Sequence, residues 1–186
     1  MTAKDLVLIA QSAAMITVCS WMSIPAAVPF TMQTFGVFLA VGLIGGRRGT
    51  AATAVYLLLG AVGLPVFSGF AGGIEHLMGP TGGYLIGFLF AALVMWLMER
   101  FFGRGMSVLV MSMAAGLVVC YAFGTAWFVI SGVKGSGAGL AAALSLCVLP
   151  YIIPDVIKIA LAAQLTRRLR PLTAAYVRTA DRNEEL

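Results

Sequence analysis

An acidic and a basic residue, Asp155 and Lys158, stand near the middle of an apolar stretch at residues 140–165. Their spacing places both side chains on one face of a helix, where they can form an ion pair. A charged residue at the centre of a membrane helix costs about 2.5 to 3.5 kcal/mol on insertion scales, so the pair needs a compensating role. Binding or transport of a polar molecule is the first such role. The alternatives are a pair that only fixes helix packing and a Lys158 that extends to the membrane interface.

The composition of the whole chain indicates that these residues belong to a membrane protein. Of its 186 residues, 61% are apolar and 10% are charged, whereas soluble domains are about half apolar and a quarter charged. A soluble fold of this length cannot bury so much apolar surface. Because a helix needs about 20 residues to cross a bilayer, and fewer where neighbours shield it, the sequence predicts an all-α integral membrane protein. Its six transmembrane helices are expected at residues 6–24, 31–46, 50–64, 83–98, 106–130 and 140–165.

Beyond this predicted membrane domain, at residues 1–165, the sequence predicts a short cytoplasmic tail at residues 166–186. Basic loop residues mark the cytoplasmic side of a membrane protein. With six crossings, all the loop and terminal cations except Lys134 fall on one side: Lys4, Arg47, Arg48, Arg100, Arg104, Arg167, Arg168, Arg170, Arg178 and Arg182. Both termini are therefore predicted to be cytoplasmic. The net charge of +5 is explained by topology and anionic lipid headgroups, and it does not indicate nucleic-acid binding.

Sequence motifs for catalysis, metal binding and nucleotide binding are absent. No Walker-type phosphate loop occurs, so the chain is not expected to hydrolyse ATP. Widely spaced cysteines within apolar segments indicate free packed thiols, at Cys19, Cys120 and Cys147. His76 follows Glu75 in a long connection, where a polar loop tip is a better interpretation than a metal ligand or an acid–base pair. The sequence thus predicts no enzyme, no metal site and no cofactor.

The connection at residues 65–82 is too apolar and too rich in glycine for a simple solvated linker. We expect it to fold back over the helices, and the alternative is a loop that packs on lipid headgroups. Gly73 is a candidate for close approach of the backbone to a ligand, because glycine has no side chain to hold a ligand away.

Four segments along the chain carry a family resemblance: residues 28–34 (VPFTMQT), 60–67 (GAVGLPVF), 77–84 (LMGPTGGY) and 149–158 (LPYIIPDVIK). In this order, they resemble the BioY family, the biotin-binding S components of energy-coupling factor (ECF) transporters. The resemblance implies a six-helix protein of the bacterial cytoplasmic (inner) membrane that captures biotin for uptake. It also implies partners, namely a transmembrane coupling subunit (the T component) and ABC ATPase subunits that hydrolyse ATP.

The resemblance also suggests where the coupling subunit docks. A family pattern of small residues in the first helix looks like Ala10 and Ala14 here, four residues apart. Small residues at this spacing let another helix approach closely, although packing inside the bundle would use the same pattern. Some family members are reported to work alone, so a stand-alone biotin carrier or a related small-vitamin secondary transporter is the alternative function.

Biotin has chemistry that suits the charged pair. Its ureido ring offers two N–H donors and a carbonyl, and its tail ends in a carboxylate. Asp155 can accept from a ureido N–H, and Lys158 can donate to the carbonyl or to the tail, so the sequence leaves the orientation of biotin open. Tyr84, Gln33 and Tyr151 are further candidates for the polar edge of the ligand, and each can equally bond to a backbone carbonyl.

Overall fold

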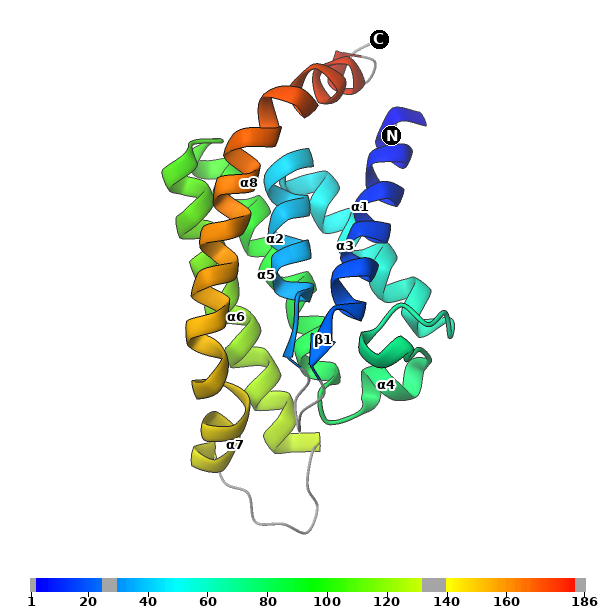
Figure 1. The fold of residues 1–186 in the computed structure, drawn as a ribbon, viewed down its shortest axis with the longest axis vertical. Coiled ribbons are helices and arrows are strands. Elements are labelled where there is room, and N and C mark those ends of the chain that lie inside the picture. The colour runs from blue at the N-terminus through cyan, green and yellow to red at the C-terminus, as the bar shows by residue number, and fades with distance from the viewer. Residues whose placement is uncertain (1–2, 25–29, 132–139, 183–186) are drawn as a thin grey trace.

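The computed structural model describes residues 3–24, 30–131 and 140–182. Its helices form a bundle in which α1 begins and α8 ends at the same end (Figure 1). The long helices are α1 (Ala3–Trp21), α2 (Gln33–Ile44), α3 (Gly46–Ala61), α5 (Gly82–Phe102), α6 (Met106–Ser131) and α8 (Leu149–Arg182), and the shorter ones are η1 (Ser68–Phe70), α4 (Ile74–Met78) and α7 (Leu140–Cys147). Two short strands, β1 (Ser23–Ile24) and β2 (Phe30–Thr31), pair in antiparallel fashion between α1 and α2.

Four of these helices are long and apolar enough to cross a membrane, within the part of the chain that the structure describes. They are α1, α5, α6 and the part of α8 from Leu149 to Ala174. This finding supports a helical membrane protein. The count of six crossings and the cytoplasmic position of the termini remain predictions.

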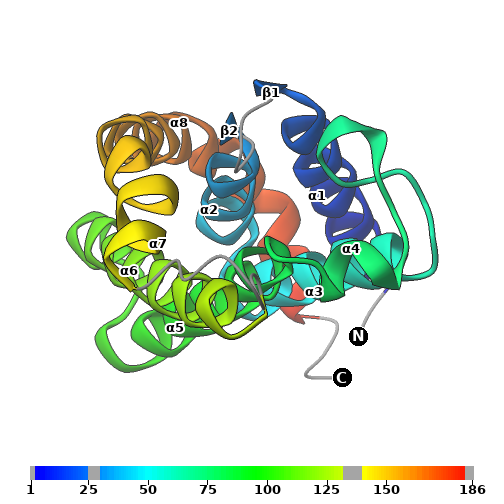
Figure 2. The ribbon, with the colours of Figure 1, turned by 90° about the horizontal axis from the view of Figure 1, so that it is seen from below.

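Helix α2 is short because it lies inside the bundle. It is apolar all round, and nearly all of its residues are buried. Figure 2 shows it among α1, α3, α5 and α8, which all contact it. A helix that is enclosed by protein does not have to match the full thickness of the lipid.

The junction of α2 and α3 differs from the prediction of a loop between residues 46 and 50. A single residue, Gly45, separates the two helices, and its φ of 90° is a conformation that glycine adopts without steric cost. Its N–H donates to the carbonyl of Val41 at 3.0 Å, which caps α2. Arg47 and Arg48 therefore lie in the first turn of α3, where Arg48 Nε donates to Asp5 Oδ1 of α1 at 2.6 Å.

The predicted sixth segment, at residues 140–165, is not one helix. It divides at Val148 into α7 and α8, and α8 then continues through Leu165 as far as Arg182. Pro150 falls in the first turn of α8, where the missing N–H of proline leaves no intrahelical hydrogen bond unmade. The charged pair consequently lies in the second and third turns of a new helix, close to its N-terminal end.

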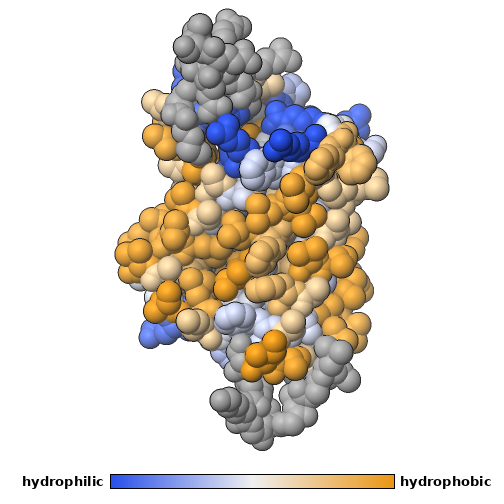
Figure 3. Space-filling view, turned by 180° about the vertical axis from the view of Figure 1, so that it is seen from behind, coloured by the Kyte–Doolittle hydropathy of each residue, from blue (hydrophilic) through white to orange (hydrophobic). Residues whose placement is uncertain are grey.

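Charged residues gather at the end of the bundle where α1 begins. Figure 3 shows hydrophilic surface toward that end and a broad apolar surface below it. Arg170 of α8 donates to the carbonyl of Arg104 at 2.9 Å, and Glu99 pairs with Arg104. Glu99 also accepts from the N–H of Gly46, at 2.7 Å. Lys134, the predicted cation of the opposite side, lies outside the described residues.

Glycines bring α5 and α6 into close contact beside the interior of the bundle. A β-carbon at Gly83 would lie 2.2 Å from Trp127, and one at Gly124 would lie 2.2 Å from the ring of Tyr84. Larger residues at these positions would force the helices apart. The close packing fixes where Tyr84 and the neighbouring Tyr121 stand.

Candidate ligand-binding site

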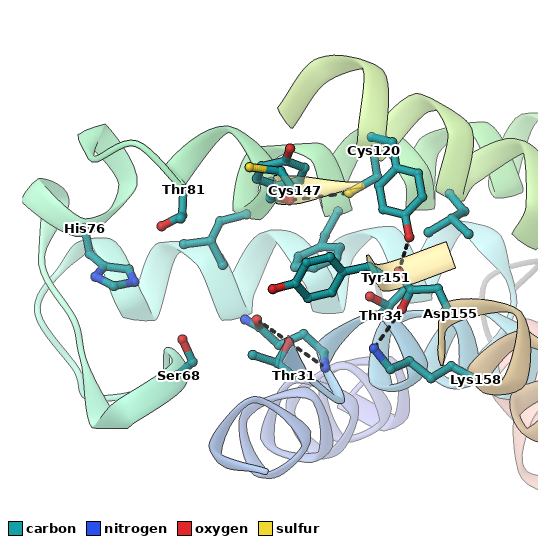
Figure 4. A pocket seen from close by; sticks show the side chains of 16 residues that line it. Thr31, Thr34, Ser68, His76, Thr81, Cys120, Cys147, Tyr151, Asp155 and Lys158 are labelled. Carbon is teal, nitrogen blue, oxygen red and sulfur yellow. Dashed lines mark hydrogen bonds and ion pairs between the residues drawn. The ribbon is translucent and has the colours of Figure 1, made fainter. Parts of the chain in front are cut away.

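A cavity opens between α2, α5, α6, α8 and the segment that joins α3 to α5. The space between its lining residues is about 660 Å³, a volume that includes solvent at the open mouth. Apolar side chains and thiols form much of the wall: Leu85, Phe88, Leu117, Cys120 and Cys147. Polar side chains stand at both ends of the cavity, and Thr31 and Tyr151 lie between the ends beside the apolar wall (Figure 4).

The predicted pair, Asp155 and Lys158, lies at one end of this cavity. Lys158 Nζ donates to Asp155 Oδ1 at 2.7 Å, and each residue is 4% exposed. The other carboxylate oxygen, Oδ2, accepts from the hydroxyl of Tyr121 on α6 at 2.5 Å. The carboxylate is thus held from two helices, which offsets much of the cost of burying its charge.

Aromatic rings cover the ammonium group of the pair. Lys158 Nζ lies 4.2 Å from the centroid of Phe30, so a cation–π contact adds to the ion pair. The ring of Phe30 in turn stacks on Tyr151, with the centroids 6.1 Å apart. Tyr151 lines the cavity, and its hydroxyl comes from the first turn of α8. The arrangement holds Lys158 inside the bundle rather than letting it extend to an interface.

Gln33 lines the cavity from the first turn of α2 and is held in a chain of hydrogen bonds. Its Oε1 accepts from Thr31 Oγ1 at 2.9 Å, and its Nε2 donates to the hydroxyl of Tyr56 at 2.5 Å. Tyr56 donates onward to Ser20 Oγ of α1 at 3.3 Å. These buried groups join α1, α2 and α3, and they hold the side chain of Gln33 in place at the wall of the cavity without a ligand.

Tyr84 also lines the cavity, from the first turn of α5. Its hydroxyl shares a hydrogen bond with Thr125 Oγ1 of α6, at 3.1 Å. Part of the polar capacity of Tyr84 is therefore used to join α5 to α6, and its ring contributes apolar wall.

The segment between α3 and α5 packs onto α3 and lines one end of the cavity, which confirms the prediction that it folds back over the helices. Val66 and Phe67 are buried, and Phe67 lies so close to α3 that a β-carbon at Gly60 would stand 2.0 Å from its ring. His76 stacks on Phe67, with the centroids 5.5 Å apart, and lines the cavity with Ser68 and Thr81. The interpretation of His76 as a polar loop tip is wrong, because the stacking on Phe67 draws its ring inward.

Gly73 does not line the cavity. It forms the N-cap of α4 with a φ of 100°, and its N–H donates to the carbonyl of Gly60 at 2.7 Å. Its positive φ lets the segment turn back onto α3, which is a structural role distinct from close approach to a ligand.

Sequence reasoning missed several residues of the cavity. Tyr121 had no local signal, because a tyrosine within an apolar helix is ordinary and its partner lies 34 positions away. Thr31 and Thr34 flank Gln33 at the start of an apolar segment, and that polar cluster was a usable signal. The described residues contain no group of three His, Cys, Asp or Glu side chains that could hold a metal ion.

Ala10 and Ala14, the predicted docking residues, are both exposed on the outer face of α1. They border a shallow apolar groove that α1 forms with α3 and with the start of the α3–α5 segment. Trp21 closes one end of the groove, where its Nε1 donates to the carbonyl of Pro65 at 2.9 Å. The two alanines therefore do not pack inside the bundle.

Comparisons with known proteins agree on one family. The family model described as "BioY family" matches residues 1–175. The "Biotin transporter BioY" of Thermotoga maritima is 42% identical over 160 residues, which cover 86% of this chain and 91% of the relative. The "Probable biotin transporter BioY" of Pyrococcus horikoshii is 39% identical over 171 residues, covering 91% of this chain and 98% of the relative.

A solved structure has a similar fold. It is the crystal structure of the S-component for biotin from an ECF-type ABC transporter, and the two folds superpose with a TM-score of 0.81 at 29% sequence identity. The match covers 92% of this chain and 95% of that chain. On the family match and the similarity of its relatives, the chain belongs to the BioY family.

Proposed function

We propose that this protein captures biotin in the membrane and serves biotin uptake as the substrate-specific component of an ECF-type ABC transporter. The observation that carries the proposal is the cavity that the buried Asp155–Lys158 pair lines, within a chain of the BioY family. The relatives are named biotin transporters, and the similar solved structure is an S-component for biotin. The protein is thus a transport component rather than an enzyme.

The layout of the cavity suits the shape of biotin. The ureido ring and the tail carboxylate are the two polar ends of that molecule, and an apolar ring and chain separate them. The cavity likewise has polar groups at its two ends, with Asp155 and Lys158 at one and Ser68, His76 and Thr81 at the other (Figure 4). Leu85, Phe88 and Leu117 are among the apolar residues that line the cavity.

Partner subunits supply the energy for uptake in this proposal. A transmembrane coupling subunit docks on α1 at Ala10 and Ala14, and ABC ATPase subunits hydrolyse ATP on the cytoplasmic side. Support comes from the exposure of both alanines beside an apolar groove. The protein would then reside in the bacterial cytoplasmic membrane with both termini inside, as its loop arginines indicate.

Binding of labelled biotin to the purified protein in detergent tests the proposal directly. We expect saturable binding of one biotin per chain, with no competition from thiamine or riboflavin. Absence of biotin binding, or equal competition by the other vitamins, would overturn the assignment of biotin as ligand. Uptake measured with and without the coupling subunits separates the ECF component from a stand-alone carrier, because a stand-alone carrier needs no partner.

A further inference from the structure

Tyr121 holds a position that neither the sequence nor the comparisons single out. Its hydroxyl donates to Asp155 Oδ2 at 2.5 Å, while Lys158 donates to Oδ1 of the same carboxylate at 2.7 Å. A phenol has one hydrogen, and a carboxylate that is paired with an ammonium group can only accept. The hydrogen of Tyr121 is therefore committed to Asp155.

This commitment decides what the oxygen of Tyr121 can do for a ligand. Tyr121 is only half-buried, and it lines the cavity beside Asp155. Its oxygen keeps acceptor capacity but has no hydrogen left to donate. A ligand group that bonds to this oxygen must therefore be a donor, such as an N–H, and a carboxylate would gain nothing from it.

We propose that Tyr121 is the acceptor for a ureido N–H of the ligand, and that Asp155 acts on the ligand through Tyr121. The inference rests on the proposed function, because it takes biotin as the ligand. A hydroxyl that donates to a charged group becomes a better acceptor in turn, since neighbouring hydrogen bonds polarise one another. The ureido ring then lies at the Tyr121–Asp155–Lys158 end, and the tail carboxylate points toward Ser68, His76 and Thr81.

Binding of modified biotins to the wild-type protein and to Tyr121→Phe tests this assignment. The probes are biotin, the two forms methylated at one ureido nitrogen, and biotinamide, which lacks the tail carboxylate. We expect the wild type to bind at least one N-methyl form about tenfold or more weakly than biotin. Tyr121→Phe should bind biotin about tenfold more weakly and should no longer discriminate against that N-methyl form. The substitution should weaken the binding of biotinamide by the same factor as the binding of biotin. The reason is that Tyr121 contacts the ureido end of the ligand, whereas biotinamide differs from biotin at the tail.

Tyr176→Phe is the matched control. This substitution also removes a tyrosine hydroxyl, but from a position on α8 that is 18 residues beyond Lys158, about 27 Å along the helix axis. This variant should bind all four probes as the wild type does. Ligand-free melting of both variants shows whether they are folded.

Several outcomes contradict the inference while leaving the proposed function intact. They are a wild type that binds biotin and both N-methyl forms equally, and a folded Tyr121→Phe protein that keeps the discrimination at lower affinity. Should Tyr121→Phe not fold, 3-fluorotyrosine at position 121 keeps the ring and the hydroxyl while weakening the acceptor. An unchanged ratio of biotin to N-methyl affinity in that protein also refutes the assignment. A wild type that binds no biotin would instead refute the proposed function.

Discussion

At Asp155, one carboxylate is held by two protein donors in a site that is nearly closed to solvent. Lys158 and Tyr121 each take one oxygen, at 2.7 and 2.5 Å. Removing one member of such a buried pair leaves the other charge uncompensated, which typically costs about 3 to 5 kcal/mol of stability. The pair is therefore expected to matter for folding as well as for binding, and variants can separate the two effects.

We predict that Asp155→Asn weakens biotin binding by about tenfold to a hundredfold, or about 1.5 to 3 kcal/mol. The amide keeps the shape of the side chain but removes the charge that orients Tyr121 and Lys158. Lys158→Met should weaken binding as well, and the double variant should lose less than the sum because both residues serve one ligand. Calorimetric titration with biotin measures these losses, and ligand-free melting reports stability.

Asp5→Asn provides the matched control for this series. Asp5 is also buried, at 1% exposed, and it pairs with Arg48 at 2.6 Å away from the cavity. This variant should melt at a lower temperature and bind biotin with unchanged affinity. If Asp155→Asn behaves like Asp5→Asn, the pair at Asp155 only supports the fold. A double variant, Asp155→Asn with Lys158→Met, that regains the wild-type melting temperature and keeps the wild-type affinity for biotin would also mean that the pair only supports the fold.

At the scale of elements, the segment between α3 and α5 depends on contact with α3. Phe67 is fully buried against Gly60, and His76 stacks on the other side of Phe67. We predict that Gly60→Ala displaces Phe67, because the added β-carbon would stand 2.0 Å from its ring. This end of the cavity then loosens, so biotin should dissociate faster and bind about tenfold more weakly, as stopped-flow binding can measure.

Gly105→Ala makes the same chemical change where space is available. A β-carbon at Gly105 meets only Val108, at 3.7 Å, and that site lies at the other end of the bundle. Its biotin kinetics should match those of the wild type. If biotin dissociates from the Gly60→Ala variant at the wild-type rate, the contact between Phe67 and Gly60 is not needed to retain biotin in the cavity.

At the scale of the whole molecule, α1 offers the surface through which the protein can meet a partner. We predict that Ala14→Arg blocks assembly with the coupling subunit and leaves biotin binding intact. An arginine on the exposed apolar groove obstructs the close approach of another helix, and no residue of α1 lines the cavity. Co-purification with the coupling and ATPase subunits checks the assembly, and labelled biotin checks the binding.

Gln11→Arg is the control for docking, because Gln11 is exposed on α1 but does not line the groove. This variant should assemble normally. A complex that survives Ala14→Arg would place the docking surface elsewhere on the molecule.

The orientation in the membrane is a second property of the whole molecule. We predict that a thiol at Glu75 reacts with an impermeant reagent in intact cells, and that thiols at Arg47 or Arg104 do not. The natural cysteines at 19, 120 and 147 are all buried, so they should contribute little background. Labelling at Arg47 without labelling at Glu75 would reverse the predicted orientation.

The sequence by itself determined what depends on local pattern. Apolar runs of nearly membrane length identified the long helices, because the bilayer requires about 20 helical residues. A charged pair at helical spacing identified Asp155 and Lys158, since such residues are costly in apolar surroundings. Alanines four residues apart marked the face of α1 that the structure leaves exposed.

Only the tertiary structure decided which distant residues join that pair. Tyr121 reaches Asp155 because α6 packs beside α8, and His76 reaches the cavity because Phe67 fits against Gly60. The division of the last segment at Val148 and the single-residue junction at Gly45 likewise follow from how neighbouring helices pack and cap. Contacts between residues far apart in sequence leave no periodic signal in either segment, so the geometry of the site appears only when the helices are assembled.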